Sequence, residues 1–298
     1  MPAKTRPERA TTRFRKLIER KRLLVLPAVG DPFSARMVAA EGFEAVMASG
    51  NATAAMRLGI PDIGLLTLAE NAENAGRIAE ASGLPVFADA DTGYGNALNV
   101  RRTIREFERQ GVAAVMIEDQ VTPKRCAMLA GKEVIPAAEM EMKIKAALDA
   151  RRDDDLVIVA RTDARAVEGL DAAIKRAQRY AEIGADVIFV EGPKTRAEAE
   201  RISREVEKPL LYNITPTGSV APLTTAELDK LGFRFLSFSV LVLLAAIPGM
   251  RGFLRSVKEQ GDVAAAARNA ASMQEYLDLL GYESWARYQD VYAVTPKS

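Results

Sequence analysis

The chain has 298 residues with 41 Lys and Arg against 40 Asp and Glu, a balance that leaves no surplus of positive charge for binding nucleic acid. One cysteine and no histidine exclude disulfides within the chain, Ser-His-Asp and Cys-His hydrolysis, and zinc sites built from His or Cys. Proton transfer must therefore use Asp, Glu, Tyr, Lys or Cys126, and any metal must be a hard cation such as Mg²⁺ or Mn²⁺ held by carboxylates.

The first 22 residues are basic but lack a continuous apolar segment, so we expect an amphipathic surface helix there and no secretory signal. Eight short apolar, β-branched runs follow, at residues 23–29, 45–49, 85–91, 113–119, 156–163, 186–192, 209–215 and 233–239. Amphipathic helical stretches separate most of them, at residues 97–110, 137–152, 171–183, 196–207 and 225–231. Strands that are apolar throughout are buried on both faces, and their alternation with helices predicts an α/β fold, the (β/α)8 TIM barrel.

The sequence after the eighth run has only a helical pattern, which continues through Trp285 and Tyr292. We therefore expect a barrel domain over residues 1–260 and additional C-terminal helices over residues 261–298 that extend the same domain. The longest apolar run, residues 236–247, contains two serines and is too short to span a bilayer, so no membrane association is expected. Together with the single cysteine, this favours a cytoplasmic protein.

Acidic residues follow several of the predicted strands, at positions 89, 91, 118, 119 and 191. The carboxyl ends of barrel strands meet at one rim, where the active sites of such barrels lie. Asp89 and Asp91 are two residues apart and would share one face of a strand. Unpaired carboxylates this close repel each other in a partly dry pocket, and a divalent cation relieves the repulsion better than Arg161 alone. Singly, each acid can equally be a helix cap or a loop residue.

Two polar segments on the same rim are suited to binding carboxylates. Ser49-Gly50-Asn51 forms a small turn whose backbone N–H groups can surround an anion, although an ordinary turn explains it equally well. Asn213, Thr215 and Thr217 offer side-chain donors around a proline, and the alternative is a polar loop that the proline terminates. Given the rim position, we expect both segments to bind substrate.

A long segment after the fourth strand contains Cys126 together with Lys124, Arg125 and Lys132. Long loops at this end of a barrel often close over substrate. Nearby cations favour the thiolate form of a cysteine and make it a usable acid or base. The alternative is a solvated basic loop with an incidental cysteine.

These motifs together resemble the isocitrate lyase/phosphoenolpyruvate mutase superfamily. The matching segments are Asp89-Ala-Asp91-Thr-Gly-Tyr-Gly-Asn96, Glu118-Asp119-Gln120, Pro123-Lys124-Arg125-Cys126 and Arg161-Thr162-Asp163-Ala164-Arg165. The resemblance implies a magnesium site with Asp91 as direct ligand and Asp62, Asp89 and Glu118 bound through water. It implies that Ser49, Gly50 and Asn51 hold the oxo-acid carboxylate, and that Arg161 binds the enolate-bearing half. Cys126 would transfer a proton to or from the other fragment, assisted by Lys124 and Arg125, while Glu191, Asn213, Thr215 and Thr217 complete the substrate site. Similar proteins form homotetramers that exchange their terminal helices.

Two departures from the family pattern bear on the substrate. Lyases of this kind have Gly-His after the cysteine, whereas this chain has Ala127-Met128, and Asn213-Ile-Thr-Pro-Thr217 is more similar to the carboxylate pocket of isocitrate lyase. We expect a magnesium-dependent carbon–carbon lyase that cleaves a methylisocitrate- or dimethylmalate-like 2-hydroxy di- or tricarboxylate. The alternatives are oxaloacetate hydrolysis or decarboxylation, phosphonomutase chemistry of the carboxyphosphonoenolpyruvate or phosphoenolpyruvate type, and a barrel without catalysis.

Overall fold

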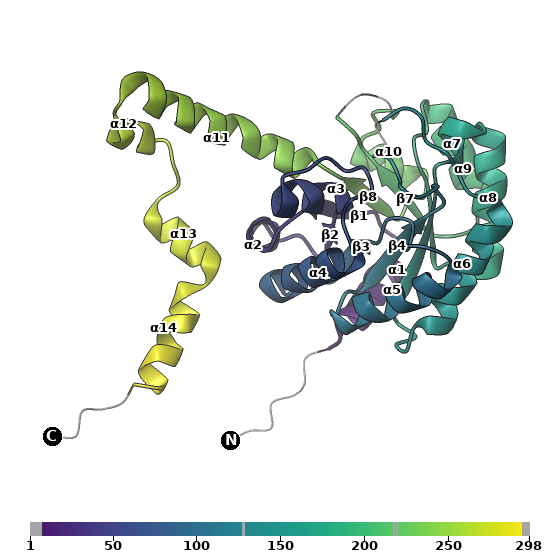
Figure 1. The fold of residues 1–298 in the computed structure, drawn as a ribbon, viewed down its shortest axis with the longest axis horizontal. Coiled ribbons are helices and arrows are strands. Elements are labelled where there is room, and N and C mark those ends of the chain that lie inside the picture. Colours follow the sequence, from purple (N-terminus) through teal and green to yellow (C-terminus); the bar gives the residue numbers. More distant parts are fainter. Residues whose placement is uncertain (1–7, 127–128, 217, 219, 294–298) are drawn as a thin grey trace. The chain divides into compact units, whose positions relative to one another are not determined.

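Eight parallel strands form a closed barrel in which each strand pairs with the next and β8 pairs with β1 (Figure 1). The computed structural model describes residues 8–293 except residues 127, 128, 217 and 219. The strands are β1 (Leu24–Val29), β2 (Val46–Ala48), β3 (Val86–Asp89), β4 (Ala114–Glu118), β5 (Val157–Thr162), β6 (Val187–Val190), β7 (Leu210–Asn213) and β8 (Phe235–Phe238). All eight lie within the predicted runs, and the predicted barrel is confirmed.

Helices follow the strands and cover the outside of the barrel (Figure 1). They are α1 (Ala10–Glu19), α2 (Pro32–Ala40), α3 (Gly50–Thr53), a π-helical turn (Ala54–Leu58), α4 (Leu68–Ser82), α5 (Ala97–Arg109), α6 (Ala137–Ala150), α7 (Ala164–Val167), α8 (Leu170–Ile183), α9 (Arg196–Glu205) and α10 (Thr225–Lys230). Their ends follow local chemistry, since the Asp31 carboxylate accepts a hydrogen bond from Ser34 N at 2.9 Å and caps α2.

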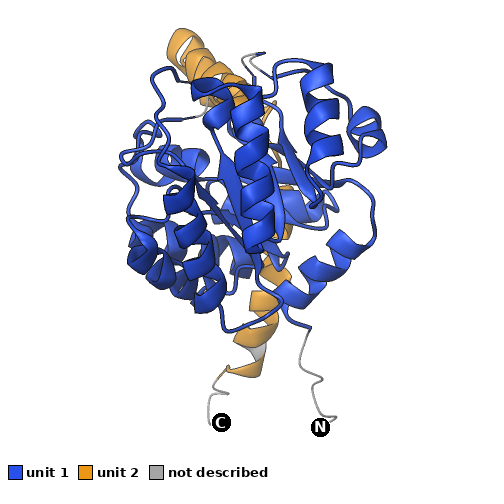
Figure 2. Ribbon diagram, turned by 90° about the vertical axis from the view of Figure 1, so that its right-hand side faces the viewer, with its two compact units in different colours: residues 1–243 blue, residues 244–298 orange. Residues whose placement is uncertain are grey.

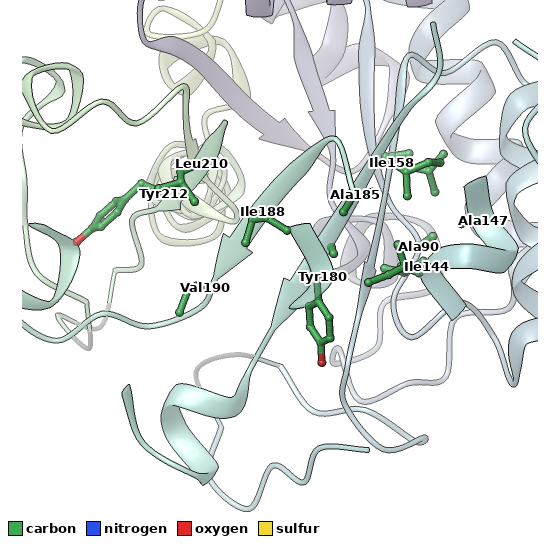
Figure 3. Close-up of a cluster of buried hydrophobic side chains, with 14 of the residues drawn as sticks. Ala90, Ile144, Ala147, Ile158, Tyr180, Ala185, Ile188, Val190, Leu210 and Tyr212 are labelled. Atoms are coloured by element: carbon green, nitrogen blue, oxygen red, sulfur yellow. The ribbon is translucent and has the colours of Figure 1, made fainter. Parts of the chain in front are cut away.

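The apolar core has two layers, one inside the barrel and one between the strands and the helices. Figure 3 shows part of the outer layer, where Ile158 and Ile188 lie near Ile144 and Tyr180 from the helices. The inner layer reaches the N-terminal end of the barrel, where Phe14 of α1 stacks on Phe235 with ring centroids 5.6 Å apart. Because α1 closes this end, access to the barrel interior is left to the opposite rim.

Residues 244–298 form a second compact unit, separate from residues 1–243 (Figure 2). Helix α11 (Leu241–Gln260) runs into this unit, which also contains α12 (Val263–Ala267), α13 (Met273–Leu280) and α14 (Tyr282–Val291). Additional C-terminal helices are thereby confirmed, while the division at residue 260 stays a prediction. Among the helices that the structure describes, none combines the length and the apolar character needed to cross a membrane.

The second unit has almost no apolar core of its own. Among its described residues, the one buried apolar side chain is Ala266, whereas Trp285 is 68% exposed and Tyr288 is 57% exposed. These two rings contact each other edge to face, with centroids 6.4 Å apart. A set of helices with this composition buries too little apolar surface to be stable alone and needs a further surface to pack against.

Candidate active site

A pocket opens at the carboxyl ends of the barrel strands and collects side chains from most of them. Its polar lining is Ser49, Asn51, Asp62, Asp89, Lys124, Arg125, Cys126, Arg161, Asn213, Thr215, Ser237 and Ser239. Its apolar lining is Met47, Met116, Phe189, Leu211, Ile214, Pro216 and Val240. The structure thus brings together in one pocket most of the residues that the sequence predicted for the site, and Asp91, Glu118 and Glu191 lie against it through the contacts described below.

Asp89 and Asp91 lie close together, but not for the reason that the sequence suggested. Strand β3 ends at Asp89, and Asp91 has a left-handed backbone with φ of 49°. The chain therefore turns between them, and the backbone N of Asp91 donates to Asp89 Oδ1 at 3.1 Å. The expected strand through residue 91 was wrong, because the side chains meet through a turn rather than through the two-residue period of a strand.

Lys124 supplies a counter-charge to these acids in the structure. Its Nζ lies 2.9 Å from Asp91 Oδ1 and also pairs with Asp62. Burial, together with the neighbouring carboxylates of Asp89 and Asp62, raises the pKa of Asp91 to about 6, although Lys124 opposes the shift. The acids are thus short of positive charge even with the lysine in place.

Arg161, near the end of β5, is surrounded by three carboxylates. Its Nε and Nη2 donate to the two oxygens of Asp163 at 2.8 and 3.0 Å. Its Nη1 lies 3.2 Å from Glu118 Oε2, and its Nη2 lies 3.7 Å from Glu191 Oε2. Burial raises the pKa of Glu118 well above its ordinary value although Arg161 opposes the shift. The guanidinium is therefore fixed in orientation, with its face 5.3 Å from the centroid of the Phe189 ring.

The donor set fits a hard divalent cation. Six carboxylates with buried side chains lie at or beside the pocket, Asp62, Asp89, Asp91, Glu118, Asp163 and Glu191, and they outnumber the buried cations near them, Lys124, Lys132, Lys143 and Arg161. Glu118 Oε1 is buried and accepts no hydrogen bond from the described residues. Among the described residues, no three Asp, Glu or Cys side chains are grouped so that they could hold a metal ion as they stand. Lys124 pairs with both Asp62 and Asp91. An excess of buried negative charge of this kind is one that a hard divalent cation such as Mg²⁺ or Mn²⁺ could offset.

The Ser49-Gly50-Asn51 turn begins helix α3 beside the acids. Ser49 Oγ accepts from Ala52 N, and Gly50 N donates to Asp89 Oδ2 at 3.3 Å. A Cβ at residue 50 would lie 3.0 Å from Asp91 Oδ1, so the glycine permits the close approach of backbone and acids. Gly50 N faces an acid of the pocket, and the expected binding of a substrate carboxylate by this turn stays a prediction.

Cys126 is buried at the pocket, with 9% of its surface exposed. The Asn51 amide Nδ2 lies 3.1 Å from its sulfur, and its backbone N donates to Asp62 O at 3.2 Å. Arg125 directs its guanidinium towards Ala130 O. The thiol therefore faces the pocket next to Asn51, and its predicted proton-transfer role stays a prediction. Residues 127 and 128, where this chain departs from the family pattern, lie outside the described residues.

Asn213 connects two neighbouring parts of the rim. Its side-chain oxygen accepts from Ser239 Oγ at 2.8 Å, and its side chain hydrogen-bonds to Glu191. Thr215 lines the pocket near Asn213, whereas Thr217 lies outside the described residues. The Asn213 amide is thus partly used within the protein, and its role in substrate binding stays a prediction.

Asp163, Ser237 and Ser239 contribute to the site without a role predicted from the sequence, and Lys132, which was expected to favour the Cys126 thiolate, has a further partner in Asp163. Lys132 Nζ pairs with Asp163 Oδ1 at 2.8 Å, so one carboxylate serves both Lys132 and Arg161. Asp163 was in view as part of the Arg161-Thr162-Asp163 motif, and its position two residues after the arginine was a usable signal. Ser239 closely follows an apolar strand, and nothing local distinguishes it from an ordinary strand-end serine.

Comparison with known proteins identifies the family of this chain. The model of the phosphoenolpyruvate phosphomutase family matches residues 14–258. The chain is 39% identical to 2,3-dimethylmalate lyase of Eubacterium barkeri, over 94% of this chain and 97% of that protein. It is 41% identical to 2-methylisocitrate lyase of Aeropyrum pernix, over 94% of this chain and 90% of that protein.

Solved structures agree with these sequence comparisons. Oxaloacetate acetylhydrolase in complex with the inhibitor 3,3-difluorooxalacetate superposes with a TM-score of 0.90 at 32% identity, over 97% of this chain and 98% of that one. Phosphonopyruvate hydrolase in complex with oxalate and Mg²⁺ superposes with a TM-score of 0.86 at 28% identity, over 96% of this chain and 99% of that one. Lyases and hydrolases thus share this barrel.

Proposed function

This chain is an enzyme that belongs to the isocitrate lyase/phosphoenolpyruvate mutase superfamily, and from that premise we propose that it is a magnesium-dependent carbon–carbon lyase. Its substrate is a 2-hydroxy di- or tricarboxylate of the methylisocitrate or dimethylmalate type, and its products are a 2-oxo acid and a second carboxylate. The observation that carries the proposal is the position of Cys126, the only thiol of the chain, which lines one pocket with Arg161 and the acid cluster.

The residues divide the chemistry between them. Cleavage turns the hydroxyl-bearing carbon into an oxo group as the hydroxyl proton passes to a carboxylate of the acid cluster, and the electron pair of the broken carbon–carbon bond passes to the departing fragment as an enolate. Cys126 gives that fragment its proton, because no imidazole exists to do so. Arg161, which the carboxylate of Asp163 orients, stabilises negative charge as it develops. A bound Mg²⁺ or Mn²⁺ supplies Lewis-acid stabilisation of the substrate oxygens, and Asp62, Asp89, Asp91 and Glu118 are the residues that would hold it.

A panel of substrates tests the reaction class. Isocitrate, methylisocitrate, dimethylmalate, oxaloacetate and phosphonopyruvate are offered with Mg²⁺, and release of glyoxylate, pyruvate or oxalate is measured. We expect a 2-oxo acid from one of the first three. Turnover of oxaloacetate or phosphonopyruvate alone would replace the lyase by hydrolase, decarboxylase or mutase chemistry on the same residues. Turnover of none of the five under these conditions would contradict the proposed substrate class.

The oligomer that we propose is a homotetramer in which neighbouring barrels exchange their C-terminal helices. The exposed rings of α14 support it, because aromatic side chains are enriched at interfaces. Light scattering at micromolar concentration should give four times the chain mass of 32.3 kDa. Trp285→Glu should lower that mass, whereas the control Leu98→Glu, at a 75% exposed position of α5, should leave it unchanged. A monomer in the parent protein would refute the proposal.

A further inference from the structure

Lys132 has a buried side chain close to the predicted catalytic residues, and the sequence predicted for it only an effect on the Cys126 thiol. Its side chain is 7% exposed, and its Nζ lies 2.8 Å from Asp163 Oδ1 in a side chain that is fully buried. Burying an ammonium group costs several kcal/mol unless a well-placed carboxylate compensates it. A lysine that only formed part of a surface loop would gain little from such a contact, so the buried pair with Asp163 indicates a role at the site.

The partner of Lys132 is the carboxylate that orients Arg161. Asp163 Oδ1 accepts from both Lys132 Nζ and Arg161 Nη2, and Asp163 Oδ2 accepts from Arg161 Nε. Burial alone would raise the pKa of Asp163, but Arg161 and Lys132 together lower it. The carboxylate is therefore ionised and shared between two cations.

The backbone around this carboxylate is fixed from the other side. Asp119 Oδ1 accepts from Asp163 N at 2.9 Å, and Asp119 Oδ2 accepts from Thr162 Oγ1 at 2.7 Å. Tyr180 and Arg176 of α8 also donate to Asp119. Asp163 therefore has little freedom to move towards either cation. Its position determines where the side chains of Lys132 and Arg161 must lie to contact it.

We propose that Lys132 is a positioning residue, which shares the Asp163 carboxylate with Arg161 and holds residues 129–132 at the end of β5. The sharing matters because Asp163, Glu118 and Glu191 all face the guanidinium of Arg161, and Lys132 offsets part of their negative charge. With Lys132 in place, more of the positive charge of Arg161 is available to the substrate. The effect on Arg161 during catalysis rests on the proposed function, whereas the contact of Lys132 with Asp163 after β5 does not.

Alkylation of the single thiol tests the contact between Lys132 and Asp163 without any substrate. Iodoacetamide is added to the parent protein, to Lys132→Gln, to Lys132→Arg and to the control Lys145→Gln, which replaces an exposed lysine of α6. Loss of one charge-assisted hydrogen bond should speed modification of Cys126 about tenfold in Lys132→Gln. Lys132→Arg and Lys145→Gln should react at nearly the parent rate. Combining Lys132→Gln with Asp163→Asn should add little to either change alone, because both break the same pair.

Turnover separates positioning from a purely structural role. On a substrate that the parent cleaves, Lys132→Gln should lower kcat about tenfold, Lys132→Arg should restore most of it, and the unfolding temperature should barely change. Alkylation of Lys132→Gln at the Lys145→Gln rate would overturn the hold on residues 129–132. A lower unfolding temperature with unchanged kcat would overturn the positioning of Arg161. If the parent cleaves nothing in the panel, the proposed function fails, and alkylation still tests the hold on residues 129–132.

Discussion

Removal of divalent cations is expected to abolish turnover, and Asp91→Ala is expected to weaken metal binding strongly. The physical reason is the buried negative charge at the pocket, where six carboxylates outnumber the buried cations near them and the pKa of Asp91 is raised to about 6. Without a divalent cation, the developing charge of the reaction adds to this excess. Activity is measured after exhaustive chelation and again after Mg²⁺ or Mn²⁺ is added back, and Mn²⁺ binding is measured directly by calorimetry.

The variants at residue 91 need a control for backbone strain. Asp91 has a left-handed backbone, which asparagine tolerates and alanine does not. Asp91→Asn therefore removes the charge while keeping shape and conformation, and it should lose metal binding as Asp91→Ala does. Asp154→Ala, at an exposed position, should bind metal as the parent does. Full activity after exhaustive chelation would contradict the metal requirement.

Cys126→Ser is expected to lower kcat by about a hundred- to ten-thousand-fold, the range that a general acid or base contributes. Serine keeps the size of the side chain and the contact with Asn51, but its hydroxyl releases a proton far less readily than a thiol. Metal binding and the unfolding temperature should stay unchanged. In the contacts described above, the Cys126 side chain contacts Asn51 and none of the proposed metal ligands. The measurement is single-turnover kinetics on the substrate that the panel identifies.

Chemical modification gives an independent measurement of the same role. Iodoacetamide should inactivate the free enzyme, and substrate should protect it, since the thiol lines the pocket. A hydrolase, decarboxylase or mutase that relies on the metal and Arg161 would barely respond to loss of the thiol. Near-normal kcat in Cys126→Ser would therefore sink the lyase assignment and favour one of those reactions.

The fold, and many of the side chains that meet at the rim, follow from the sequence alone. Continuous apolar runs alternating with amphipathic stretches specify a parallel barrel, because only a sheet covered on both faces buries such strands. Acids placed directly after those runs must then meet at one rim. The absence of histidine restricts the acid–base chemistry and the metal ligands, and this restriction holds however the chain folds.

The tertiary structure alone decided which of these groups contact one another. Asn51 reaches Cys126 across 75 residues, and Lys132 reaches Asp163 across 31. Periodicity reports only the local face on which a side chain lies, so it carries no information about such partners. The turn that brings Asp91 back onto Asp89 depends on a left-handed residue that the strand-like pattern conceals. Patterns of a few residues determine which segments form helices and strands and which residues lie at the rim of the barrel. Which charged groups pair depends on distances that only the closed barrel sets.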